Sequence, residues 1–228
     1  ENHDQPRGAS LFIPEEDYGF YSLSALATII FCERGLPFLY QGQEIGMSNR
    51  RWQYDEFNDL ETINQYQIAL KAGMSKEQAL EIAGHHSRDN ARTPMQWSSE
   101  ENAGFSKGKP WMPVNENYKV VNVAEEEKEY GSILNFYKRL IAFYKSEEYN
   151  EILTYGDFRP MYKKEDHIFA YSRSYGCQKL VLICNFSSKE KDIELAEDYE
   201  NVIFVNYEQT TVIGNTLKMK PYECVDRK

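Results

Sequence analysis

Residues 21–40 read YSLSALATIIFCERGLPFLY, and this stretch decides the fold class. Its first part carries apolar residues at helical spacing: Ala25, Leu26, Ile29 and Ile30. This spacing predicts a helix over residues 21–34, which Gly35 would end. The apolar run at 36–40 then predicts a short buried strand. A helix that leads through a glycine turn into a buried strand is half of a β/α repeat, so this part of the chain is expected to be α/β.

Three more helices are expected before residue 149. Residues 60–72 form the first, and Ser75 with Gln78 gives the capping-box pattern of a second, over 75–82. The third spans 132–144 and has an apolar face made of Ile133, Phe136, Tyr137, Leu140, Ile141 and Tyr144.

After about residue 149 the apolar pattern indicates strands instead of helices. Five short strands are expected, at 168–173, 179–185, 192–195, 202–205 and 216–219. Turn residues such as Gly176 and Gly214 separate them. This pattern predicts a small antiparallel β domain. We therefore expect two domains, residues 1–148 and residues 149–228.

The charge balance narrows the classes of partner. The chain has 36 acidic and 26 basic side chains and a formal net charge of −10, which argues against nucleic acid and anionic lipid. No apolar run approaches the roughly 20 residues that a membrane helix requires. Residues 1–8 are polar and charged, unlike a signal peptide. We expect a cytoplasmic protein without nucleic-acid or membrane partners.

Cysteine and histidine positions give no sign of a metal site. The four cysteines form no C-x-x-C pair, so free thiols in a reducing compartment are expected, with a Cys177–Cys184 disulfide as the alternative. His85 and His86 are adjacent, and adjacent histidines rarely share one metal. No metal and no cofactor are therefore expected.

Three segments carry a family resemblance: ENHDQPR at 1–7, GLPFLYQGQEIGM at 35–47 and SRDNARTPMQW at 87–97. Their order and spacing resemble the oligo-1,6-glucosidase branch of the α-amylase family, glycoside hydrolase family 13. The similarity continues through residues 103–105, Trp111 and the β domain, and so covers nearly the whole chain.

The resemblance implies a (β/α)8 barrel followed by an antiparallel β-sandwich. A complete barrel needs about 250 residues, so residues 1–148 would be the C-terminal part of an incomplete barrel. The chain would begin at the end of the seventh strand, and residues 41–113 would form the active-site loop. Retaining glycosidases use two carboxylates about 5 Å apart as nucleophile and general acid. The family places both in earlier strands, so this chain alone is expected to be inactive.

The resemblance also assigns roles to particular side chains. Asp4 corresponds to the family's third carboxylate, which stabilises the transition state by binding the sugar hydroxyls at C2 and C3; the alternative is a turn residue. His3 corresponds to a second group at these hydroxyls. Arg88 would hold the non-reducing end of a bound glucose, or else brace the loop through an ion pair. Arg7 and Glu44 could reach the substrate or brace the loop.

Other residues near these motifs have less certain roles. Arg92 is expected to be structural. The aromatic residues in the loop could be sugar platforms, but core packing is the favoured interpretation for each: Tyr40, Trp97, Phe105 and Trp111.

The implied activity is hydrolysis of α-1,6 or α-1,4 glucosidic bonds in isomalto- or malto-oligosaccharides, from the non-reducing end and with retention. Trehalose-6-phosphate hydrolase, sucrose isomerase and trehalose synthase are alternatives within the family. A non-catalytic carbohydrate-binding protein or transporter heavy chain is an alternative of another class. A barrel that lacks strands would expose apolar surface, so self-association of the chain is also expected.

Overall fold

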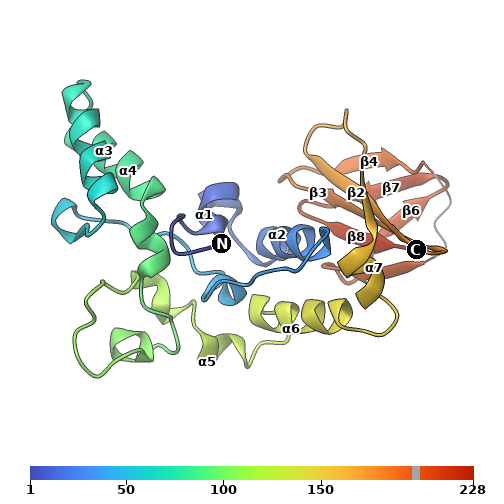
Figure 1. Cartoon of the computed structure of the whole chain (residues 1–228), viewed down its shortest axis with the longest axis horizontal. Helices are drawn as coiled ribbons and strands as arrows, with labels where there is room; N and C mark the ends of the chain where they lie inside the picture. The colour runs from blue at the N-terminus through green and yellow to red at the C-terminus, as the bar shows by residue number, and fades with distance from the viewer. Residues whose placement is uncertain (197–200) are drawn as a thin grey trace. The chain divides into compact units, whose positions relative to one another are not determined.

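The computed structural model describes residues 1–196 and 201–228, which divide into two compact units (Figure 1). The first unit comprises Glu1–Glu16 and Phe38–Asn135, and the second comprises Asp17–Pro37 and Phe136–Lys228. The domain boundary expected between residues 148 and 149 differs from the boundaries of these two units, and it stays a prediction.

The first unit consists of short helices joined by long loops, and none of its described residues forms a strand. Its elements, including one 3-10 helix that ends at the unit boundary, are α1 (Gly8–Phe12), η1 (Glu15–Asp17), η2 (Gln43–Ile45), η3 (Tyr54–Glu56), α3 (Leu60–Lys71), α4 (Lys76–His86), η4 (Arg88–Arg92), η5 (Glu101–Gly104), η6 (Glu116–Lys119) and α5 (Val123–Glu126). Outside α3 and α4, residues 41–113 contain only short 3-10 helices and irregular segments.

Helices α3 and α4 form an antiparallel hairpin (Figure 1). Asp59 caps α3, and Ser75 caps α4 through the expected capping box with Gln78. The helices pack through small residues and one aromatic ring: Tyr66, Ala69, Ala79 and Ala83. Both predicted helices are confirmed, and α4 continues through the buried Gly84 to His86.

The strand expected at residues 36–40 is wrong for this structure. The segment joins no hydrogen-bonded ladder, and its apolar side chains are exposed: Leu36 by 71%, Phe38 by 82% and Leu39 by 38%. A buried parallel strand needs a hydrogen-bonding neighbour on each side and a covering layer on each face. The described residues supply no strand neighbour here, so the apolar pattern alone does not produce a strand.

The second unit is a β-sandwich with helices. Its elements, with one helix that begins just before the unit boundary, are α2 (Phe20–Cys32), α6 (Ile133–Tyr144), α7 (Asn150–Tyr155), β1 (Asp157–Met161), β2 (Ile168–Tyr175), β3 (Gln178–Asn185), β4 (Lys191–Glu194), β5 (Val202–Val205), β6 (Thr211–Ile213), β7 (Thr216–Met219) and β8 (Cys224–Arg227). One sheet has the order β1-β2-β3-β8-β5 and the other has the order β4-β7-β6, with antiparallel pairing throughout.

The core of the sandwich lies between the two sheets. Both sheets contribute buried apolar residues to it: Ala170, Val181, Ile183, Ile193, Leu195, Leu217, Met219 and Val225. The other face of the five-stranded sheet is covered by α2, since the Tyr171 hydroxyl donates to Ile29 O at 2.9 Å and Arg173 Nη1 to Cys32 O at 2.8 Å. Because β3 is buried on both faces, its sequence is almost continuously apolar.

All five predicted strands are confirmed, and the turns at Gly176 and Gly214 have positive φ. Among the described residues of the second unit, three strands and one helix were not expected: β1, β6, β8 and α7. Strand β8 reads CVDR, a polar sequence in the middle of a sheet, where Asp226 lies under α2 within 3.6 Å of Cys32 Sγ. The missed strands are short or polar, so alternation cannot reveal them.

All four cysteines are free, so the alternative Cys177–Cys184 disulfide is not formed. Cys177 is exposed, whereas the other three are buried, and Cys184 lies opposite Cys224 between β3 and β8. In the part of the chain that the structure describes, no helix is long and apolar enough to cross a membrane.

Candidate active site

Asp4 lies in a cluster of charged side chains in the first unit. Its Oδ1 accepts hydrogen bonds from Arg92 Nη2 at 3.1 Å and from Arg88 Nη1 at 3.4 Å, and its Oδ2 lies 3.2 Å from His3 Nε2. The Asp4 side chain is 49% exposed. The structure therefore brings three predicted site residues, His3, Asp4 and Arg88, to one accessible surface.

The turn that presents Asp4 is held by backbone contacts. The Asp4 N–H donates to Asn2 Oδ1 at 2.8 Å, and Arg92 Nε donates to the His3 carbonyl at 3.2 Å. The Gly8 N–H donates to Glu1 Oε1 at 2.8 Å, and this hydrogen bond links the two ends of the segment that contains the turn. Arg92 thus holds both the backbone and the carboxylate of this turn, which agrees with its expected structural role.

Arg88 bridges Asp4 and a residue that the sequence did not single out, Asp59. Arg88 Nε and Nη2 both donate to Asp59 Oδ1, at 2.9 and 2.7 Å. Burial raises the pKa of the Asp59 carboxyl, but hydrogen bonds from Arg88 and Thr62 outweigh it and hold the pKa below its ordinary value. The same hydrogen bonds from Arg88 to Asp59 raise the pKa of the Arg88 guanidinium. The pair is therefore ionised at neutral pH.

Helix η4 presents Arg88 and Arg92 because the residues between them are buried. Asn90 Nδ2 donates to the carbonyls of Gly84 and Ser87, each at 2.8 Å, and Asn90 Oδ1 accepts from Trp52 Nε1 at 2.7 Å. Buried polar groups with complete hydrogen bonding fix a loop firmly. The motif at 87–97 thus uses its central asparagine as an anchor and its arginines as presented groups.

Arg7 is fully buried, unlike Asp4. Its guanidinium donates to backbone carbonyls of three residues, Gln41 at 2.6 Å, Asn90 at 3.2 Å and Ala91 at 3.5 Å. Burial lowers the pKa of Arg7, and the Glu1 carboxylate 3.6 Å away opposes this effect. With no exposed surface, Arg7 joins the three motif segments and has no free donor for a sugar.

Glu44 lies in η2 and contacts none of the Asp4 cluster by a described hydrogen bond. Its Oε2 is buried and has no hydrogen-bond partner among the described residues. Burial raises the pKa of Glu126 to about 7, and the charge of Glu44 adds to this effect. Glu126 Oε2 accepts from the Leu134 N–H at 2.9 Å, at the start of α6. Glu44 therefore lies within electrostatic reach of Glu126 and Arg7 and outside the hydrogen-bonded Asp4 cluster.

Three of the four aromatic candidates are exposed, which corrects the expectation that they pack in a core. Trp97, Phe105 and Trp111 are exposed by 51%, 49% and 74%. They lie between η4 and η6, where the chain is mostly irregular. Tyr40 does pack, since its hydroxyl donates to Ala91 O at 3.0 Å and the Arg7 guanidinium lies 5.5 Å from its ring centre.

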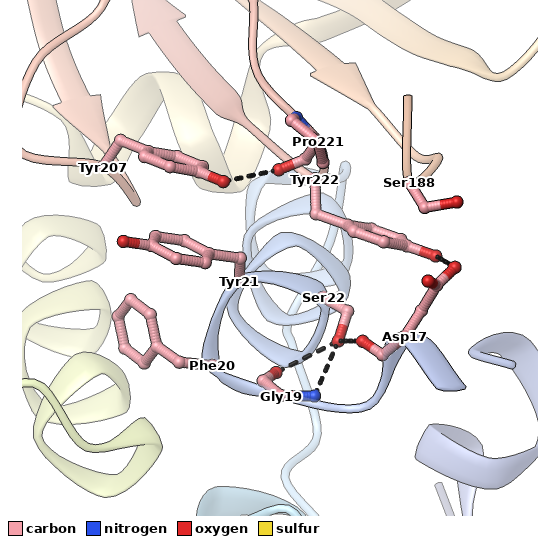
Figure 2. A pocket seen from close by; sticks show the side chains of 9 residues that line it. All are labelled: Asp17, Gly19, Phe20, Tyr21, Ser22, Ser188, Tyr207, Pro221 and Tyr222. Carbon is pink, nitrogen blue, oxygen red and sulfur yellow. Dashed lines mark hydrogen bonds between the residues drawn. The ribbon is translucent and has the colours of Figure 1, made fainter. Parts of the chain in front are cut away.

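A small pocket of about 180 Å³ lies in the second unit, beside the start of α2 (Figure 2). Tyr21 and Tyr207 stack at 3.9 Å, and the Tyr222 hydroxyl donates to Asp17 Oδ2 at 2.7 Å. Figure 2 shows the aromatic rings packed beside one another, with the Tyr207 hydroxyl turned to Pro221 O. The pocket contains none of the predicted site residues.

The Asp4 cluster has the chemistry needed to bind a polyhydroxylated ring. A carboxylate accepts hydrogen bonds from hydroxyls, and a planar guanidinium can donate to two neighbouring hydroxyls. Among residues 1–196 and 201–228, no group of three or more His, Cys, Asp or Glu side chains could hold a metal ion.

Comparison with known proteins agrees with this geometry. The family model described as "Alpha amylase, catalytic domain" matches residues 1–156, and the one described as "Alpha-amylase SusG C-terminal domain" matches residues 168–225. The chain belongs to the α-amylase family. It thus holds part of the catalytic domain of this family, followed by the β domain.

Relatives of known activity match over the whole chain. The oligo-1,6-glucosidase of Bacillus cereus is 40% identical over 230 residues, which cover 98% of this chain and 41% of that protein. Two solved structures cover 100% of this chain. The trehalose-6-phosphate hydrolase of Bacillus licheniformis is 36% identical, with a TM-score of 0.91, and this chain covers 42% of it. The isomaltulose synthase SmuA of Protaminobacter rubrum is 33% identical, with a TM-score of 0.89, and this chain covers 41% of it. The chain thus spans about two fifths of the length of these α-amylase family members.

Proposed function

We propose that this chain forms the substrate-binding edge of an α-glucosidase active site. The enzyme would hydrolyse α-1,6 or α-1,4 glucosidic bonds of isomalto- or malto-oligosaccharides from the non-reducing end, with retention. Its nucleophile and general acid would come from the part of the family's barrel that lies outside the matched region, so the chain by itself would be inactive. The free cysteines support a cytoplasmic location.

The observation that carries this proposal is the meeting of His3, Asp4 and Arg88 at one exposed surface. Asp4 would accept hydrogen bonds from the C2 and C3 hydroxyls of the sugar that is cleaved, and His3 would contact the same hydroxyls. Such hydrogen bonds strengthen as positive charge develops on the ring in the transition state. Arg88 would close the pocket behind one glucose and so favour action at chain ends.

Arg7 and Glu44 have a different role in this proposal. Both would position the loops that carry the binding residues, because Arg7 is fully buried and Glu44 makes no described hydrogen bond to the Asp4 cluster. The exposed Trp97 and Trp111 are better placed to contact a sugar ring through their faces.

The direct test is hydrolysis of p-nitrophenyl-α-glucoside by two purified proteins. One is the 228-residue chain, and the other is a chimera in which it replaces the matching part of the Bacillus cereus relative. We expect activity in the chimera alone, and Asp4→Asn should reduce its kcat/KM by at least about 100-fold. Activity of the 228-residue chain that is lost in Asp4→Asn would show that other carboxylates act here, and would refute the proposal.

A second candidate activity within the family is rearrangement of a glucosidic bond or hydrolysis of a phosphorylated sugar. Similarity to an isomaltulose synthase and to a trehalose-6-phosphate hydrolase supports it. Product analysis of the chimera with sucrose, isomaltose and trehalose 6-phosphate separates these activities. Since the binding residues are retained and assembled, a non-catalytic role is the less favoured alternative.

A further inference from the structure

The contact between Arg88 and Asp59 fixes one edge of the guanidinium and leaves Nη1 with a longer contact to Asp4. Nε and Nη2 of Arg88 both donate to one oxygen, Asp59 Oδ1, at 2.9 and 2.7 Å. The remaining nitrogen, Nη1, lies 3.4 Å from Asp4 Oδ1. The Arg88 side chain is 36% exposed, whereas that of Asp59 is only 4% exposed. A buried carboxylate therefore orients an exposed cation.

Asp59 is itself held from two sides. Its second oxygen, Oδ2, accepts from Thr62 Oγ1 at 2.8 Å and from the Thr62 N–H at 3.2 Å, so it caps α3. Its backbone N–H donates to Asp89 Oδ2 at 2.9 Å, and the Asn58 N–H donates to the same oxygen at 2.8 Å. The start of α3 and the start of η4 thus hold each other through reciprocal carboxylate contacts.

We propose that Asp59 is a positioning residue that sets the orientation of Arg88 for substrate binding, and that the start of α3 supports this orientation. The inference rests on the proposed function because it concerns the same site. A guanidinium held along its Nε–Nη2 edge can offer a sugar only the hydrogens of its Nη1–Nη2 edge, so Asp59 determines where the non-reducing end is bound.

Asp59→Asn separates this role from helix capping. Asparagine caps a helix about as well as aspartate, so α3 keeps its N-cap. The amide has only one acceptor oxygen, and if that oxygen caps α3, the NH2 group faces the Arg88 donors and cannot accept from them. The matched control is Ser75→Ala, which removes the N-cap of the other helix of the hairpin and does not contact Arg88.

The first test uses the 228-residue chain labelled with ¹⁵N-arginine. NMR of the arginine Nε–H groups should show a slowly exchanging Arg88 signal in the unchanged chain and in Ser75→Ala. Asp59→Asn should speed its exchange at least about tenfold, since hydrogen bonds to charged groups are among the stronger ones. Equal exchange in Asp59→Asn and the unchanged chain, with α3 intact by amide shifts, would overturn the proposal.

The second test measures kcat/KM of the active chimera for isomaltose. Asp59→Asn should lower it at least about tenfold, mainly through KM, and Ser75→Ala should stay within about twofold. An active chimera that is unaffected by Asp59→Asn would refute the positioning role. If the unchanged chimera is inactive, the proposed function has failed, and the NMR result still decides whether Asp59 orients Arg88.

Discussion

At the level of single residues, charged side chains of one sequence motif differ in how deeply they are buried. Asp4 and Arg7 belong to one heptad, yet Asp4 is exposed by half and Arg7 is fully buried. A buried charge must be paired or hydrogen-bonded, whereas an exposed one can exchange water for a ligand. The heptad therefore contains a half-exposed carboxylate, which we propose binds substrate, and a buried structural group three residues apart.

Arg7→Ala should destabilise the first unit by about 3 kcal/mol, because it leaves the Glu1 carboxylate and three carbonyls without their partner. Urea unfolding followed by circular dichroism measures this loss. Arg51→Ala is the control, since the Arg51 side chain is 92% exposed, and it should change stability by less than about 0.5 kcal/mol. Similar losses in both variants would contradict the structural role of Arg7.

Glu126 gives a prediction about pH. Burial raises its pKa to about 7, so the folded protein holds a proton that the unfolded chain releases near its ordinary pKa of 4.5. Its contribution to stability is present below about pH 4.5 and is lost as the pH rises to about 7. Glu126→Gln should therefore be more stable than the unchanged chain at pH 8, by on the order of 1 kcal/mol after allowance for solvent screening.

The measurement for Glu126→Gln is thermal unfolding at pH 5 and pH 8. The difference from the unchanged chain should be larger at pH 8. Glu125→Gln is the control, because Glu125 is exposed and pairs only with Lys128 at the surface. A Glu126→Gln effect that does not change with pH would show that this carboxyl titrates normally in the folded state.

At the scale of elements, caps and glycines determine where the loops turn. The sequence predicted the N-cap Ser75, whereas the N-cap Asp59 was not singled out. At Gly42, tertiary packing as well as the turn requires a glycine. It has φ +87°, and a Cβ built on it would overlap Met47 Sδ.

Gly42→Ala should destabilise the loop that carries Glu44, by about 2 kcal/mol, through strain and overlap with the buried Met47 side chain. Gly131→Ala is the matched control, because no atom lies within 4 Å of a Cβ at Gly131. Differential scanning calorimetry of both variants checks the prediction. Equal unfolding temperatures would mean that the loop adjusts to the added methyl group without cost.

At the scale of the whole molecule, the exposed segment at residues 36–40 is the main departure from a closed fold. Leu36 and Phe38 are exposed by 71% and 82%, although the sequence there is that of a buried strand. Apolar surface of this kind favours association. The expectation of self-association therefore stays a prediction of ours, now attached to a particular segment.

The purified chain should associate as its concentration rises, and Phe38→Ser should weaken this association because Phe38 is 82% exposed. Sedimentation velocity between about 1 and 100 µM measures it, and an interface of ordinary affinity would form in this range. Val120→Ser is the control, since Val120 is also exposed but lies outside the segment. A single monomeric species at every concentration would refute the prediction.

The sequence by itself determined the helices at 60–72, 75–82 and 132–144 and five strands of the β domain, because local periodicity and caps decide such elements. It also indicated Asp4, His3 and Arg88 through motif order. Tertiary structure alone decided that Arg7 is buried, that Asp59 holds Arg88, and that residues 36–40 form no strand. These outcomes depend on partners far away in sequence, and a strand or a buried charge is stable only when those partners are present.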